Sequence, residues 1–210
     1  MEDSVKYFSS GMIGWISIYF IVLIWSVLNP KDPFTWFLEV APALVAVFVL
    51  MMTKATFPLT TLTYVLILIH CIILMIGGHY TYAEVPLFDW LRDITGQERN
   101  NYDKVGHFVQ GFVPAIIARE IVIRKKIIVV SSWRNFFIIC FCLAFSAFYE
   151  LIEWWVALLT GENAEAFLGT QGFVWDTQSD MALALLGAIM ALLFLSGIHD
   201  RQLLLMKKMA

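Results

Sequence analysis

Acidic and histidine side chains occur in this sequence as pairs, spaced three or four residues apart inside apolar stretches. The pairs are Asp103 with His107, Glu150 with Glu153, and Asp176 with Asp180. Residues at these spacings lie on one face of an α-helix, so each pair presents two polar groups to the same side. Ionisable groups at membrane depth are costly and usually face a bundle interior or a watery cavity. These pairs are therefore the candidate functional site.

A divalent metal ion is the chemistry that such a set of groups suggests. Carboxylates brought together repel one another unless they are protonated or bridged by a cation. Two histidines with several carboxylates suit Zn²⁺, Mn²⁺ or Fe²⁺, and a carboxylate subset suits Mg²⁺. Such an ion would polarise a phosphate group or activate a water molecule. The expected metal ligands are His79, His107, Glu150, Glu153, Asp176 and Asp180, and the expected catalytic groups are Glu150, Glu153, His107 and Asp180.

Some of these residues also have ordinary structural explanations. Asp176 would serve equally as the N-cap of a helix, and Asp103 as an interfacial charge. His70, in the middle of an apolar segment, would be a hydrogen-bonded core histidine. Glu150 and Glu153 lack an explanation of this kind, because they lie late within an apolar segment rather than at its start.

The composition indicates that these groups belong to a membrane protein. The chain has 210 residues, of which 60% are hydrophobic and 15% are charged. Soluble domains are about 45–50% apolar and about 25% charged. A net charge of -3 and the lack of a basic stripe indicate no nucleic-acid partner. We expect a single integral membrane domain over residues 1–210 that contacts membrane lipids, and the sequence does not identify its protein partners.

Six segments are long and apolar enough to cross a bilayer, which takes about 20 residues. They cover residues 11–28, 36–52, 58–76, 105–123, 136–159 and 176–196. Between the third and fourth segments, residues 85–96 predict a short helix that lies at the membrane interface, where Tyr and Trp are enriched. The predicted fold class is all-α, a polytopic membrane helical bundle of six transmembrane helices with this short interfacial helix.

The orientation follows from lysine and arginine in the short loops, because cytoplasmic loops carry an excess of both. Basic residues follow the fourth segment and the last one: Arg124, Lys125, Lys126, Arg134, Arg201, Lys207 and Lys208. The loop after the fifth segment carries only Glu162 and Glu165 as charges. Both termini are therefore expected in the cytoplasm. The candidate site residues then share one outer depth, and Gly169–Gly172 would let the outer loop fold over them.

Three motifs carry a resemblance to a known family. They are DKVGHFVQG (103–111), YELIEWW (149–155) and FLGTQGFVWDTQSDM (167–181), and they resemble those of the YjdF-type bacterial inner-membrane proteins. This resemblance covers about residues 10 to 196; it implies a multi-pass protein of the bacterial inner membrane and implies no activity. A fainter similarity to the VanZ-like proteins, which are linked to glycopeptide resistance, rests on Asp103-Lys104, His107-Phe108, Glu150 and Asp180. Position 184 is Ala where VanZ-like proteins tend to have Asn.

Three functions remain compatible with the sequence. The first is hydrolysis or transfer on the headgroup of an envelope lipid or an isoprenoid-linked compound, at a metal site near the outer face. The second is a small proton- or ion-coupled transporter in which Glu150 and Glu153 relay protons. For this function the first two segments supply almost no polar residues. The third is a non-catalytic envelope protein that binds a partner, with carboxylates that only join helices.

Overall fold

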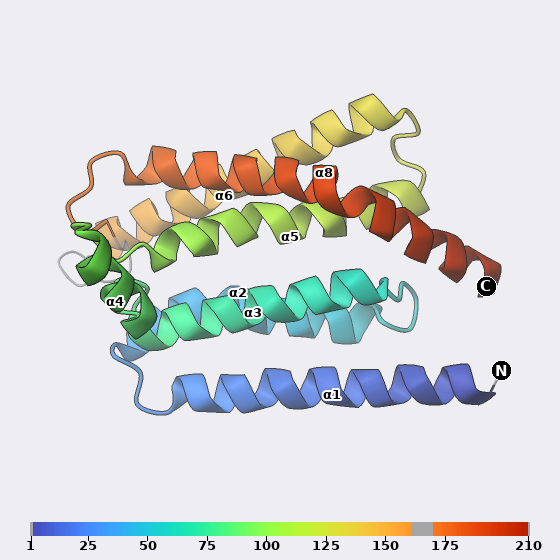
Figure 1. The fold of residues 1–210 in the computed structure, drawn as a ribbon, viewed down its shortest axis with the longest axis horizontal. Coiled ribbons are helices and arrows are strands. Elements are labelled where there is room, and N and C mark those ends of the chain that lie inside the picture. Colours follow the sequence, from blue (N-terminus) through green and yellow to red (C-terminus); the bar gives the residue numbers. More distant parts are fainter. Residues whose placement is uncertain (1, 161–169, 210) are drawn as a thin grey trace.

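The computed structural model describes residues 2–160 and 170–209, and all regular secondary structure in these ranges is helical (Figure 1). The helices are α1 (Glu2–Val27), α2 (Pro33–Thr53), α3 (Thr61–Tyr80), α4 (Pro86–Thr95), α5 (Tyr102–Arg124), α6 (Ser131–Thr160) and α8 (Asp176–Met209). Five of them (α2, α3, α5, α6 and α8) are long and apolar enough to cross a membrane, and α1 adds the shorter apolar segment Gly11–Val27. The prediction of an all-α, polytopic membrane bundle is confirmed.

Local sequence explains where the helices begin. The backbone N–H of Thr35 donates to Asp32 Oδ1 over 2.6 Å and thereby caps α2, whose first residue is Pro33. Thr60 caps α3 in the same way, so this helix begins three residues after Pro58. Helix α5 begins at Tyr102, so Asp103 lies in its first turn, one turn before His107. The loop residues Glu162, Glu165 and Gly169 lie outside the described residues.

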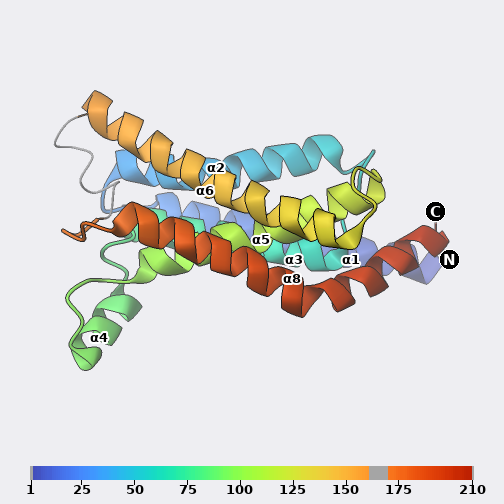
Figure 2. The same ribbon diagram turned by 90° about the horizontal axis from the view of Figure 1, so that it is seen from above.

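The two ends of the bundle differ. Helix α1 begins and α8 ends at one end, which we call the terminal end, and α4 crosses the other, which we call the site end (Figures 1 and 2). Helix α4 exposes Leu87, Trp90 and Ile94, which share one face by their spacing. This amphipathic face fits the predicted interfacial helix. The chain begins and ends at the same side of the bundle, as an even number of membrane crossings requires.

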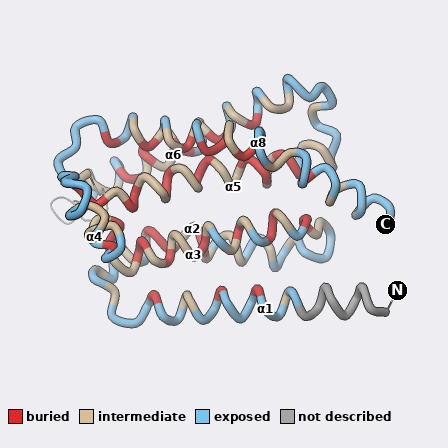
Figure 3. The backbone as a smooth tube through the Cα atoms, viewed as in Figure 1, coloured by how far each residue is buried: buried red, intermediate tan, exposed pale blue. Residues whose placement is uncertain are grey.

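Helix α5 lies at the centre of the packing and contacts α3, α6 and α8. Buried residues concentrate on α5 and on the helix faces turned toward it, whereas the described part of α1 is mostly exposed (Figure 3). The contact with α8 is the closest one. A methyl group added at Gly111 would overlap the carbonyl of Ala184, and one added at Gly187 would overlap the carbonyl of Phe108. The two glycines therefore let the backbones of α5 and α8 touch.

A buried ionic network joins α3, α5 and α8 near the terminal end. The Glu120 carboxylate is fully buried and accepts hydrogen bonds from the Thr60 backbone N–H at 2.9 Å and the Thr63 hydroxyl at 2.7 Å. Arg124 donates to it over 2.9 Å, and His199 Nε2 lies 3.2 Å from it. Both carboxylate oxygens of Glu120 are satisfied by the protein itself. This network therefore needs no ligand to be stable.

The close contact between α5 and α8 predicts a large effect of Gly111→Ala. The added methyl group must push the two backbones apart, and overpacking of this kind costs about 1–3 kcal/mol. We expect a lower free energy of unfolding in detergent. Gly197→Ala on α8 is the matched control, because a methyl group there meets nothing within 4 Å. Equal stability of the two variants would contradict the proposed backbone contact.

Candidate functional site

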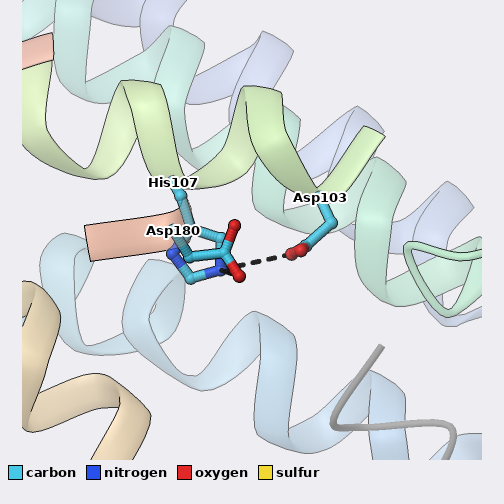
Figure 4. Close-up of side chains that lie close together, drawn as sticks. All are labelled: Asp103, His107 and Asp180. Carbon is cyan, nitrogen blue, oxygen red and sulfur yellow. Dashed lines mark ion pairs between the residues drawn. The ribbon is translucent and has the colours of Figure 1, made fainter. Parts of the chain in front are cut away.

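Three buried side chains converge where α5 faces the beginning of α8 (Figure 4). His107 Nε2 lies 3.2 Å from Asp103 Oδ1 and 4.0 Å from Asp180 Oδ2. One donor atom from each of the three residues lies within 4.8 Å of the others. Asp103 and His107 come from successive turns of α5, and Asp180 comes from the second turn of α8. The structure thus brings the predicted pair Asp103 and His107 together with Asp180, one member of a second predicted pair.

A carboxylate and an amide complete the surroundings of His107. Its Nδ1 lies 3.0 Å from Gln110 Oε1 and 3.7 Å from Glu150 Oε1. When Nδ1 carries the proton and donates it to Gln110, the lone pair of Nε2 points toward Asp103 and Asp180. An outer partner of this kind is the usual device that orients a metal-binding imidazole. Gln110 is therefore a positioning residue for His107.

Two carboxylate oxygens of this group are buried without a hydrogen-bond partner. They are Glu150 Oε1 and Asp180 Oδ1. Buried polar atoms are almost always satisfied, and a buried charge needs a counter-charge. Protonation or a bound cation would supply what these oxygens lack. The site end of the bundle therefore differs from the terminal end, where Glu120 is fully satisfied.

Arg99 covers the cluster from the loop between α4 and α5. It donates a short hydrogen bond to Asp176, and its Nη2 lies 3.5 Å from Asp103 Oδ2. The guanidinium also lies 5.5 Å from the centre of the Phe173 ring. Arg99 thus ties the loop to the first turns of both α5 and α8. Asp176 is paired with this arginine and lies outside the group of three.

Two cavities adjoin the cluster, and Glu153 lines both. The inner cavity, of about 60 Å³, extends from Asp103 and His107 to Glu39, His70 and Tyr149. The Tyr149 hydroxyl donates to Glu39 Oε2 over 3.5 Å. The outer cavity, of about 460 Å³, lies between α6 and α8 and is lined by Glu150, Asp176 and Thr177 among others.

Tyr82 closes the inner cavity from the loop after α3. Its ring fits against Gly77 and Gly106, where an added methyl group would overlap it. Burial, together with the charges of Glu39 and Asp103, raises the pKa of the Tyr82 phenol. The phenol therefore stays neutral at physiological pH, so Tyr82 lines the inner cavity without adding a charge to it.

The structure places all the predicted site residues except His79 at or beside the cluster. His107, Glu150 and Asp180 lie together, with Asp103 beside them. Glu153 and Asp176 line the adjoining cavities.

His79 lies elsewhere in the structure. Its Nδ1 lies 3.0 Å from the Ser26 carbonyl, and its ring lies 4.5 Å from that of Trp25. Its contacts therefore join α3 to α1. In the expected cover loop, Gly172 adopts a left-handed conformation with φ of 81°, and Gly169 lies outside the described residues.

Glu39 and Arg99 are the functional candidates that the sequence pattern did not identify. Glu39 is the sole charged residue of α2, a helix that otherwise consists of apolar residues, Thr and Pro. A lone buried acid in an apolar span is itself a signal for function, so this residue was identifiable. Arg99 lies in a polar loop, where a single arginine carries no pattern. The second span thus does supply a polar group to the site.

Comparisons with known proteins agree with a membrane fold. The family described as predicted membrane protein (DUF2238) matches residues 12–201. Inner membrane protein YjdF of Escherichia coli (strain K12) is 50% identical over 183 residues, which is 87% of this chain and 88% of that protein. No solved structure matches the chain.

The Arg99 bridge predicts that Arg99→Gln destabilises the site end. Loss of the guanidinium leaves Asp176 buried without its ion-pair partner and leaves Asp103 with His107 alone, which costs about 3 kcal/mol. Denaturation in detergent measures this loss. Arg92→Gln is the matched control, since Arg92 pairs with Asp89 and Asp93 on a partly exposed helix, where a pair contributes below about 1 kcal/mol. The double variant with Asp176→Asn should recover part of the stability, and equal losses at the two arginines would contradict the bridge.

Proposed function

The chain belongs to the DUF2238 family of predicted membrane proteins, and we propose that it is a metal-dependent enzyme of the cell envelope. It is a multi-pass inner-membrane protein, and the predicted similarity to the YjdF-type proteins is confirmed. The proposed reaction is hydrolysis or transfer on the headgroup of an envelope lipid or an isoprenoid-linked compound. The observation that carries the proposal is the convergence of Asp103, His107 and Asp180 with donor atoms within 4.8 Å.

The donor set favours a metal ion that prefers oxygen. With His79 turned toward α1, the cluster contains one imidazole and two carboxylates, and Glu150 is the next nearest acid. One nitrogen with several carboxylates suits Mg²⁺ or Mn²⁺ best, and Zn²⁺ and Fe²⁺ remain compatible. Asp180, whose Oδ1 has no hydrogen-bond partner, is one of the donors that such an ion would bind, and Glu150 lies on the Nδ1 side of His107, outside this set.

A metal ion also makes an anionic substrate acceptable. The cluster and its cavities present the carboxylates of Asp103, Asp180, Glu150, Glu153 and Glu39. A phosphate group would be repelled by this wall unless a cation lay between them. The ion would hold the phosphate and activate a water molecule. Glu150 and Glu153 border the outer cavity, where either one would serve as the general base.

The proposed orientation places the site at the outer face of the membrane. The basic residues that follow α5, begin α6 and end α8 lie at the terminal end of the bundle. Cytoplasmic segments carry such residues in excess. Both termini are therefore proposed to be cytoplasmic. The metal site would then open toward the outer leaflet and the compounds that are present there.

A proton- or ion-coupled transporter is the second candidate, and Glu39 is the observation that favours it. Glu39, His70 and Glu153 extend the polar lining from the cluster into the bundle. The path does not continue to the terminal end, because an apolar groove follows and the Glu120 network there is already satisfied. Transport through the bundle would need a polar route across this region. We therefore place this function second.

The metal proposal predicts about one divalent ion per purified chain. His107→Ala and Asp180→Asn each remove a donor from the cluster, and we expect them to lose the ion at least tenfold more readily, since even outer partners contribute about 10–100-fold. Elemental analysis after dialysis measures the content. His79→Ala is the matched control and should retain the ion. Metal-free wild-type protein that melts identically with and without chelator would exclude the metal, and proton flux in liposomes would then favour the transporter.

The proposed orientation predicts the behaviour of reporter fusions. After Ile127, between α5 and α6, a green fluorescent protein fusion should fluoresce and an alkaline phosphatase fusion should be inactive. After Gln97, beyond the end of α4, the phosphatase should be active and the fluorescent protein dark. Alkaline phosphatase and green fluorescent protein fusions at both positions make the comparison internally controlled. The inverse pattern would place the site in the cytoplasm and remove the envelope substrates from consideration.

A further inference from the structure

An apolar groove leads away from the inner cavity toward the terminal end of the bundle. It has a volume of about 520 Å³ and lies between α2 and α3 on one side and α5 on the other. Its wall runs along α2 from Pro42 to Thr53 and along α5 from Val113 to Lys125. Almost every lining residue is apolar. Besides Thr53 and the Cys71 thiol, the polar side chains are His70, at the end near the inner cavity, and Lys125, at the far end.

The groove adjoins the inner cavity, and the two spaces share part of their lining. Four residues line both spaces: Pro42, His70, Leu74 and Phe145. An occupant with one polar end would thus have its polar end near His107 and Glu153 and its apolar part along α2 and α5. A space that changes from charged to hydrocarbon lining over a few residues matches an amphiphile. A water-soluble substrate does not match this space, because it has no apolar part to occupy the groove.

The length of the path distinguishes between classes of lipid. From His107 to Lys125, α5 rises about 27 Å at ~1.5 Å per residue. The hydrocarbon core of a bilayer is about 30 Å thick, so one leaflet supplies about 15 Å. The chains of an ordinary glycerophospholipid with its head at the site would end near the middle of the groove. A single chain roughly twice as long would fill it.

We infer that the groove holds the chain of a long polyisoprenoid phosphate whose phosphate lies at the metal site. This inference rests on the proposed function and specifies the substrate class of that same site. The competing occupant is a glycerophospholipid of the other leaflet with its phosphate at Lys125. Arg124 at that end already pairs with Glu120, and the Lys125 ammonium lies 5.3 Å from the centre of the Phe57 ring.

Two variants narrow the groove without disturbing the core. Val49 is 48% exposed and Ile121 is 39% exposed, and both line the groove. Val49→Trp and Ile121→Trp therefore place an indole in the path of the chain while the buried contacts stay in place. Ile24→Trp is the matched control, because Ile24 is 58% exposed on α1 and lies away from the groove.

Native mass spectrometry of the full chain in detergent micelles provides the measurement. The protein is titrated with undecaprenyl phosphate, farnesyl phosphate and a dipalmitoyl phosphatidic acid, with Mg²⁺ or Mn²⁺ present. We expect undecaprenyl phosphate to bind at least about tenfold more tightly than either of the others, because affinity grows with the buried apolar length. Val49→Trp and Ile121→Trp should abolish this preference, and Ile24→Trp should keep it.

The metal content of the same samples separates the two proposals. A wild-type chain that binds metal but shows no preference for the long chain refutes the occupant of the groove and leaves the metal centre standing. Equal binding of phosphatidic acid, or a preference that survives both groove variants, also refutes it. A wild-type chain without metal refutes the proposed function, whatever the lipid titration gives.

Discussion

The contact between the backbones of α5 and α8 is the interaction on which the site depends. Gly111 receives the carbonyl of Ala184, and Gly187 receives that of Phe108. His107 lies one turn before Gly111 on the same face of α5, and Asp180 lies one turn before Ala184 on α8. Helices that touch at backbone distance bring short side chains such as Asp within reach of a facing imidazole, which larger residues at the contact would prevent. The geometry of the site therefore depends on glycine at positions 111 and 187, where no side chain separates the two helices.

The two buried charge clusters of the bundle show opposite solutions to the same problem. A carboxylate in a region of low dielectric needs hydrogen bonds and a counter-charge from its surroundings. Glu120 receives these from Thr60, Thr63, Arg124 and His199, so that cluster holds α3, α5 and α8 together. At the site end several acids surround one histidine, and two oxygens lack partners. An excess of buried acids without enough internal cations is costly for stability alone, and it becomes favourable once a cation is bound.

The sequence predicted the membrane bundle because apolar length is a local property. The helical spacing of Asp103 with His107, and of Asp176 with Asp180, likewise predicted which side chains share a face. What could not be predicted is how each helix rotates about its axis, since this is set by packing between helices. That rotation turns His79 toward Ser26 and brings Glu39 into the cavity beside Tyr149. Arg99 reaches Asp176 across 77 residues of sequence, and no spacing rule relates such partners.

The arrangement of the three spaces argues for one amphiphilic occupant. Glu153 lines the outer and the inner cavity, and His70 lines the inner cavity and the groove, so the spaces form a series that crosses from charged to apolar surroundings. A purely structural bundle would fill such a path with side chains, because empty volume between helices loses dispersion energy. A channel for ions would keep the path polar to the far end, which the lining from Val113 to Ile121 does not. A lipid with a charged headgroup would fill both the polar cavities and the apolar groove. The protein's carboxylates that would surround the headgroup need a cation, because a buried negative charge needs a counter-charge.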